Sequence, residues 1–132
     1  MPFLTWETRF SVGAAMDAEH KTWFGILNRL HDAMAQGKGK DVQQKILIEM
    51  VAYTHTHFAH EESFLQSRNY PDLPAHRSLH VTFTKKVRDL ESKVKAGLPV
   101  LSVELMDFLR DWLQNHILTH DVKYGTWMKA NG

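Results

Sequence analysis

Apolar residues recur at steps of three and four along most of this chain, a spacing typical of helices with one buried face. The clearest stripe begins at Leu73 and continues through His76, His80, Phe83, Val87, Leu90 and Val94. Similar stripes predict four long helices, over residues 17–36, 41–68, 72–96 and 100–119.

Turn-forming residues separate the four predicted helices. Glycine or proline occurs in each of the segments 37–40, 69–74 and 97–99, which predicts short connections there. Short connections make neighbouring helices antiparallel, so the sequence predicts an all-α, antiparallel up-down-up-down four-helix bundle. Residues 1–16 are expected to form an N-terminal arm and residues 121–130 a short C-terminal helix, with residues 1–132 in a single domain.

Composition narrows the range of functions. The 132 residues include 16 lysines and arginines and 15 aspartates and glutamates, so nucleic acid is not an expected partner. The N-terminus lacks the pattern of a secretion signal, no apolar run is long enough to enter a membrane as a spanning helix, and cysteine is absent, which together favour the cytoplasm. Without thiolates, any metal must be bound by nitrogen and oxygen. One bundle uses all the apolar stripes, so a monomer is expected.

The nine histidines are numerous for a chain of this length, and several occupy positions that a bundle would fill with leucine. Each predicted helix contributes at least one histidine to its buried face, at His20, His57, His76, His80 and His116. A lone inward histidine is more often a hydrogen-bonded core residue than a metal ligand. Burying several such groups together costs on the order of several kcal/mol unless they satisfy one another or share an ion, so the combination predicts a metal site.

The predicted ligands are five imidazoles and two carboxylates: His20, His57, Glu61, His76, His80, His116 and Asp121. This set is too large for one tetrahedral zinc ion. Two octahedral ions fit better, because the imidazoles, two bridging carboxylates and a bridging oxo or hydroxo group would leave one position open for an external ligand. The predicted division places His76, His80 and His116 on one ion, and leaves His20 and His57 on the ion with the open position. Nitrogen and oxygen ligands suit iron.

The other four histidines are not expected to bind these ions. His31 returns to the helix face of His20, but roughly 16 Å farther along the axis, so it is predicted to lie near the end of the bundle. His55 and His60 point away from the buried stripe of their helix, and His120 lies near a helix end. Solvated or capping roles are predicted for these three.

Several short motifs occur together along nearly the whole chain. WE at residues 6–7, FSVG at 10–13 and DAEHK at 17–21 form the first block, HFAHEE at 57–62, YP at 70–71 and HRSLH at 76–80 the second, and WLQNHI at 112–117 with Asp121 the third. In this combination the chain resembles the hemerythrin family, in particular the single-domain bacteriohemerythrins. One small departure is Glu19, where many relatives have glutamine.

The resemblance implies a non-haem pair of iron ions, bridged by Glu61, Asp121 and an oxo or hydroxo group, that binds dioxygen reversibly. It implies that dioxygen binds at the ion held by His20 and His57. Reversible binding requires a pocket that excludes water. The candidates for its lining are three apolar residues near His20 or His116, for which ordinary core packing is an equally good explanation: Phe24, Leu113 and Ile117.

The expected function is carriage, storage or delivery of oxygen without enzymatic activity, with an oxygen-consuming enzyme as a candidate partner. A di-iron oxidase or peroxidase is one alternative, but ferritin-like enzymes use Glu-x-x-His pairs, which this sequence lacks. A sensor of oxygen or redox state is the other. Sensor domains of this kind are usually joined to a signalling domain. Because the bundle is expected to use the whole sequence, no residues are expected to form such a domain.

Overall fold

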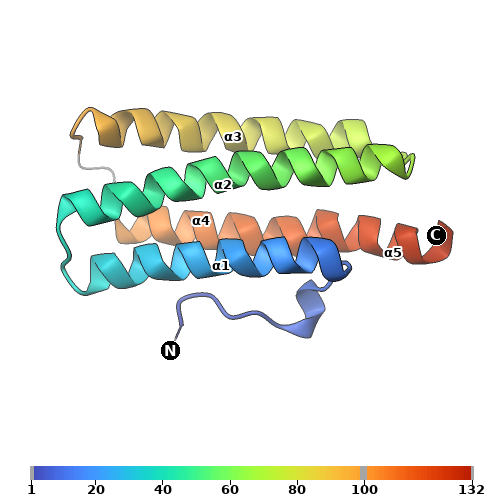
Figure 1. Ribbon diagram of the computed structural model, residues 1–132, viewed down its shortest axis with the longest axis horizontal. Helices are drawn as coiled ribbons and strands as arrows, with labels where there is room; N and C mark the ends of the chain where they lie inside the picture. The colour runs from blue at the N-terminus through green and yellow to red at the C-terminus, as the bar shows by residue number, and fades with distance from the viewer. Residues whose placement is uncertain (1, 99–100, 132) are drawn as a thin grey trace.

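The computed structural model describes residues 2–98 and 101–131, and its four long helices form a bundle (Figure 1). They are α1 (Ala14–Ala35), α2 (Lys40–Ser67), α3 (Leu73–Lys95) and α4 (Val103–His116). Helix α1 packs against α2 and α4, and α2 packs against α3. Successive helices run in opposite directions (Figure 1), so the predicted up-down-up-down four-helix bundle is confirmed.

The boundaries of the first three helices lie within three residues of their predicted positions. Gly37 and Gly97 follow α1 and α3 with φ angles of +67° and +83°, a left-handed conformation that glycine adopts without steric cost. The predicted start of the fourth helix at residue 100 lies outside the described residues. Helix α4 begins after Ser102, whose hydroxyl oxygen accepts a hydrogen bond from the backbone N–H of Leu105 at 3.1 Å and so caps the helix.

The C-terminal part of the chain differs from the prediction. The sequence predicts a break before a separate tail helix, whereas α4 continues through a π-helical turn, η2 (Ile117–Asp121), into α5 (Val122–Asn131). Residues five apart lie about 140° apart around an α-helix, but a π-turn hydrogen-bonds residues five apart and so stacks them. The wider turn therefore brings Asp121 to the same face as His116.

The N-terminal arm runs beside α1 (Figure 1) and contains one short 3-10 turn, η1 (Thr8–Phe10). Its extended part is fixed by Asn28 of α1. The Asn28 side chain accepts a hydrogen bond from the Leu4 backbone N–H and donates one to the Leu4 carbonyl, both at 2.8 Å. Leu4 and Phe10 are buried, so the arm is part of the core.

The buried apolar residues form two clusters with a polar layer between them. The smaller cluster, near the α2–α3 turn, contains Met16, Leu65, Tyr70, Leu73 and Tyr124. The larger cluster fills the rest of the bundle. On α1, His20 follows Met16 of the smaller cluster and precedes Trp23 of the larger one. Helix α3 repeats this order, and α2 and the continuous segment from α4 to α5 show it in reverse because they run in the opposite direction. Apolar packing on both sides therefore fixes the position of the polar layer.

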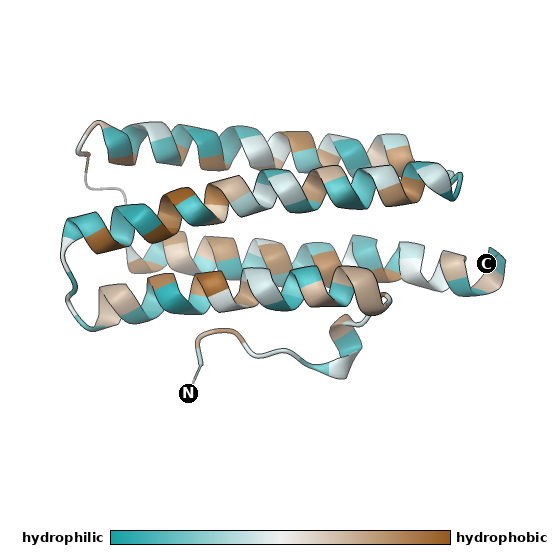
Figure 2. Ribbon diagram, in the orientation of Figure 1, coloured by the Kyte–Doolittle hydropathy of each residue, from teal (hydrophilic) through white to brown (hydrophobic). Residues whose placement is uncertain are grey.

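The helices are amphipathic rather than apolar throughout. Hydrophilic and hydrophobic positions alternate around each of them (Figure 2). Among the residues that the structure describes, no helix is both long enough and apolar enough to span a membrane.

Candidate metal centre

Buried polar side chains are concentrated in the layer between the two apolar clusters. Among the described residues, eight polar side chains are buried: His20, Thr54, His57, Glu61, His76, His80, His116 and Asp121. Thr54 is satisfied within its own helix, because its hydroxyl donates to the Met50 carbonyl at 2.8 Å. The other seven are the residues that the sequence predicts as metal ligands.

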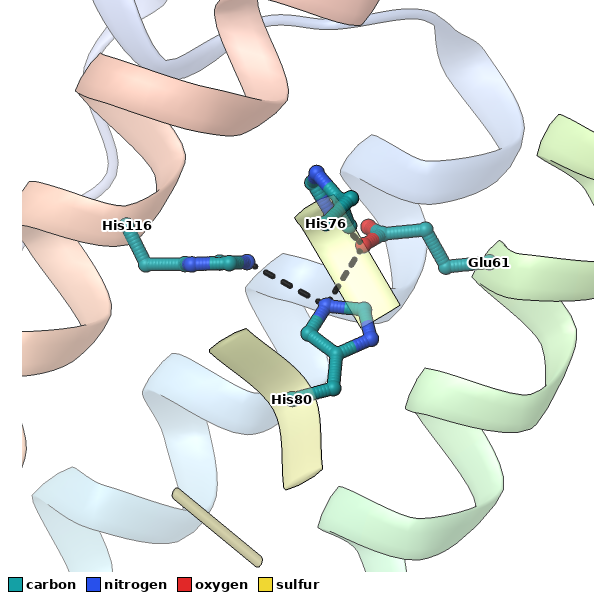
Figure 3. A group of neighbouring side chains, drawn as sticks. All are labelled: Glu61, His76, His80 and His116. Atoms are coloured by element: carbon teal, nitrogen blue, oxygen red, sulfur yellow. Dashed lines mark hydrogen bonds and ion pairs between the residues drawn. The ribbon is translucent and has the colours of Figure 1, made fainter. Parts of the chain in front are cut away.

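Every long helix contributes to this layer. Helix α1 supplies His20, α2 supplies His57 and Glu61, α3 supplies His76 and His80, α4 supplies His116, and η2 supplies Asp121. Figure 3 shows Glu61, His76, His80 and His116 directed toward a common space from three helices. His76 and His80 are one helical turn apart, as are His57 and Glu61, which places each pair on one helix face.

The potential ligand atoms form two groups that share one residue. The first group is His20, His57 and Glu61, and the second is Glu61, His76, His80 and His116; in each, the ligand atoms lie within 4.8 Å of one another. The two oxygens of Glu61 are divided between the groups. Oε2 lies 3.3 Å from His57 Nε2 and 3.6 Å from His20 Nε2. Oε1 lies 2.7 Å from His76 Nε2 and 3.1 Å from His80 Nε2.

The oxygens of Asp121 are divided in the same way. Oδ2 lies 3.2 Å from His20 Nε2. Oδ1 lies 3.1 Å from His76 Nε2 and 3.2 Å from His116 Nε2. Each carboxylate therefore presents one oxygen to each group of histidines, which is the arrangement that can join two neighbouring metal ions.

Several polar atoms in the layer lack a partner. Within the described part of the chain, no hydrogen bond satisfies either nitrogen of His20 or either oxygen of Asp121. The Nε2 atoms of His80 and His116 face each other at 3.2 Å. An unsatisfied buried polar group costs about 1–3 kcal/mol, and cations between these atoms would satisfy them. A donor set of imidazole nitrogens and carboxylate oxygens fits iron, so the residues fit a metal of this kind.

The electrostatics of the metal-free layer favour bound positive charge. Burial would lower the pKa of His20 and His76, but Asp121 and Glu61 raise the pKa of each to about 9. Burial likewise opposes ionisation of Glu61, yet hydrogen bonds from the surrounding imidazoles hold its pKa well below the usual value. The pKa of Asp121 is lowered, against burial and the nearby Glu61 charge, by His116 and His20. Protons on histidines balance the two carboxylates, and metal cations can replace these protons.

Tyr124 is a site residue that the sequence did not predict. Its hydroxyl is buried in the smaller apolar cluster and donates a hydrogen bond to Glu61 Oε2 at 3.0 Å. Burial, together with the charges of Glu61 and Asp121, raises the pKa of Tyr124, so the hydroxyl remains a neutral donor. Its position three residues after Asp121 is the only signal in the sequence.

Two glutamates next to the layer were also not predicted. Glu19 accepts a hydrogen bond from Nδ1 of His57, and Glu62 accepts one from Nδ1 of His80, both at 2.8 Å. Glu19 directly precedes a predicted ligand in the sequence, and Glu62 directly follows Glu61. This adjacency to predicted ligands is the feature of the sequence that could have identified Glu19 and Glu62.

The remaining histidines lie outside both groups, each with a contact of its own. His31 stacks on Phe3 with ring centroids 4.2 Å apart, His55 accepts a hydrogen bond from Arg88 Nε at 2.8 Å, His60 Nδ1 lies 3.1 Å from Glu19 Oε2, and the His120 ring lies 5.5 Å from that of His116.

The three residues predicted to line an oxygen pocket, Phe24, Leu113 and Ile117, are buried in the larger apolar cluster. The Phe24 ring contacts the arm, where its centroid lies 5.3 Å from that of Phe10 and 5.5 Å from that of Trp6. Their contact with dioxygen stays a prediction.

The four-helix bundle and its buried layer of histidines and carboxylates are typical of the class of helical bundles that bind metal in their core. Comparisons with known proteins identify the family within this class. Residues 12–127 match the family described as "Hemerythrin HHE cation binding domain". The chain therefore belongs to the hemerythrin family, which binds iron, and the resemblance inferred from the motifs is confirmed.

Individual relatives support this assignment. A bacteriohemerythrin from Methylococcus capsulatus is 35% identical over 133 residues, which cover 98% of this chain and 100% of that relative. A bacteriohemerythrin from Pseudomonas aeruginosa is 34% identical over 125 residues, covering 94% of this chain and 80% of that relative. A crystal structure of wild-type hemerythrin superposes with a TM-score of 0.88 at 33% identity, covering 94% of this chain and 96% of that one.

Proposed function

We propose that this chain binds dioxygen reversibly at two iron ions held in the buried layer. The observation that carries the proposal is the division of Glu61 and Asp121, each of which presents one oxygen to each group of histidines. Membership of the hemerythrin family, a family of oxygen-binding proteins, supports the same function. The proposed ligands are His76, His80 and His116 on one ion, His20 and His57 on the other, and Glu61, Asp121 and an oxo or hydroxo group as bridges.

The chemistry that an iron pair supplies is reversible binding of dioxygen with exchange of two electrons. The protein's residues decide where this takes place. The group of His20 and His57 contains one histidine fewer than the other group, which makes it the proposed place for dioxygen. Tyr124 fixes the Glu61 oxygen that faces this group, by donating its hydroxyl hydrogen to Oε2.

The group that contains His20 and His57 is slightly more buried than the other group. His20 and His57 are 0% and 1% exposed, and the Trp23 ring lies 5.6 Å from that of His57. In the other group, His76 and His116 are 4% and 5% exposed and His80 is 1% exposed, and surface depressions of about 310 Å³ lie beside His80 and beside His76. Excluding water from the proposed dioxygen side supports reversible binding, because water and protons promote irreversible oxidation.

We further propose that the chain carries or stores oxygen rather than oxidising a substrate. Five imidazoles and only two carboxylates form the layer, the opposite balance from the carboxylate-rich ferritin-like sites. The proposal treats residues 1–132 as a single-domain monomer of the cytoplasm, as the sequence predicts. An oxygen-consuming enzyme remains the proposed recipient.

The test is the iron content and the visible spectrum of the purified protein, reduced without oxygen, exposed to air and then purged. We expect two irons per chain and an absorption band that appears with oxygen and disappears on purging. Iron that oxidises once and never recovers would contradict reversible binding. A purified protein that takes up no iron would contradict the ligand assignment.

A further inference from the structure

Two half-buried carboxylates lie just outside the seven-residue layer and reach across to a neighbouring helix. Glu19 of α1 lies 2.8 Å from Nδ1 of His57 on α2, and Glu62 of α2 lies 2.8 Å from Nδ1 of His80 on α3. The two glutamate side chains are 24% and 22% exposed. Each carboxylate therefore forms a short, partly shielded hydrogen bond to the outer nitrogen of a buried histidine.

The two contacts are distributed evenly over the site. His57 belongs to the first group of ligand atoms and His80 to the second, so each group contains one histidine held in this way. The Nε2 atoms of the same rings lie 3.3 Å and 3.1 Å from the oxygens of Glu61. A histidine that donates from Nδ1 to a carboxylate directs the lone pair of Nε2 inward, which is the tautomer that binds a metal.

Each carboxylate is itself fixed at its second oxygen. Glu19 Oε2 lies 3.1 Å from Nδ1 of His60, and Glu62 Oε1 accepts a hydrogen bond from Arg77 Nε at 3.0 Å. A carboxylate held at both oxygens cannot rotate freely, so it fixes the ring to which it is bonded. His80 is also held by the Phe58 ring, stacked on it with centroids 3.7 Å apart.

From these contacts we propose that Glu19 and Glu62 are positioning residues for the metal centre. Each fixes the tautomer and orientation of one ligand histidine, Glu19 for the ion of His57 and Glu62 for the ion of His80. The inference rests on the proposed function, since it requires that the layer binds metal. A carboxylate that hydrogen-bonds to the outer nitrogen of a metal-binding histidine typically contributes a factor of about 10 to 100 in metal affinity.

A simpler role would produce the same contacts. Glu19 ties α1 to α2 and Glu62 ties α2 to α3, so both could serve only to hold helices together. The two roles predict different losses. A helix tie affects the unfolding of the metal-free protein, whereas a positioning residue affects metal affinity more than metal-free stability.

The experiment compares Glu19→Ala, Glu19→Gln, Glu62→Ala and Glu62→Gln with the wild-type chain. Affinity for Fe²⁺ is measured without oxygen by competition with a chelator, and thermal unfolding is measured on the metal-free proteins. Glu91→Ala is the matched control, because Glu91 is 22% exposed on α3 and forms its ion pair with Lys95, away from the layer.

We expect each alanine variant to bind Fe²⁺ about 10- to 100-fold more weakly, with metal-free unfolding no more affected than in the Glu91→Ala control. The glutamine variants should recover much of the affinity, because an amide oxygen still accepts a hydrogen bond from Nδ1. Alanine variants that match wild-type affinity, or that lose metal-free stability without losing affinity, would overturn the positioning role while the proposed function stands. A wild-type chain that binds no Fe²⁺ would refute both.

Discussion

Tyr124→Phe removes a single hydroxyl group from the centre of the bundle and leaves the aromatic ring in place. The hydroxyl donates to Glu61 Oε2 at 3.0 Å, and both residues are fully buried. The substitution creates almost no cavity, because only one oxygen atom is lost. A change in stability therefore reports on the hydrogen bond to the buried carboxylate.

The size of the effect follows from the charge of the acceptor. A hydrogen bond to a charged group contributes about 1.5–3 kcal/mol, and loss of the donor leaves Glu61 with one partner fewer. For a chain of 132 residues, 1 kcal/mol corresponds to roughly 3–5 °C in melting temperature. The metal-free variant should therefore melt roughly 5–15 °C below the wild-type chain. The difference should shrink in the iron-loaded protein, where cations also balance the carboxylate.

Thermal unfolding followed by circular dichroism, with and without a chelator, measures both differences. Tyr70→Phe is the control, because the Tyr70 ring lies in the same apolar cluster, 6.2 Å from that of Tyr124. Within the described residues, the Tyr70 hydroxyl forms no hydrogen bond. Equal shifts for the two variants, or no shift for Tyr124→Phe, would show that the bond to Glu61 does not stabilise the fold.

Three further predictions follow from packing and charge. In the iron-loaded protein, Leu113→Ala should speed irreversible oxidation in air more than the control Leu109→Ala, which removes an equally buried leucine one turn away. Equal oxidation rates would show that Leu113 does not keep water out of an oxygen pocket. The metal-free protein should lose stability as the pH rises from about 6.5 to about 9, because His20 and His76, with pKa values of about 9, keep protons that the unfolded chain releases. Urea unfolding across this range measures how the free energy of unfolding changes with pH, and a stability that rises with pH would contradict the prediction. Gly125→Ala should cost about 1–3 kcal/mol in the same assay, because its Cβ would lie 3.1 Å from a backbone Cα of the arm, and an unchanged midpoint would mean that the arm can move away.

The four long helices could be predicted from the sequence because their signals are local. Spacing of apolar residues fixes which face is buried, and glycine or proline fixes where three of the connections fall. The continuous helix through η2 could not be predicted in this way. Its π-helical turn places both His116 and Asp121 in the buried layer, a requirement set by side chains from other helices.

The same distinction separates the site residues that were found from those that were missed. Six of the seven buried residues occupy core positions of their own α-helices, so helical periodicity was sufficient to find them, whereas Asp121 reaches the buried layer through the π-helical turn, which periodicity does not predict. Glu19 and Glu62 act across a helix interface, and their orientation depends on how far each helix is rotated toward its neighbour. Tyr124 faces Glu61 only because the π-turn shifts the phase of α5.

The order of layers explains how a small bundle tolerates so many buried polar groups. Each helix passes through an apolar cluster on both sides of the polar layer, so packing that involves no ligand fixes the backbone positions of the ligands. The two carboxylates then stay ionised, because imidazoles rather than water surround them. In the metal-free protein, protons on His20 and His76 balance their charge. Metal cations bound in this layer would therefore replace protons on the histidines as the charges that balance Glu61 and Asp121.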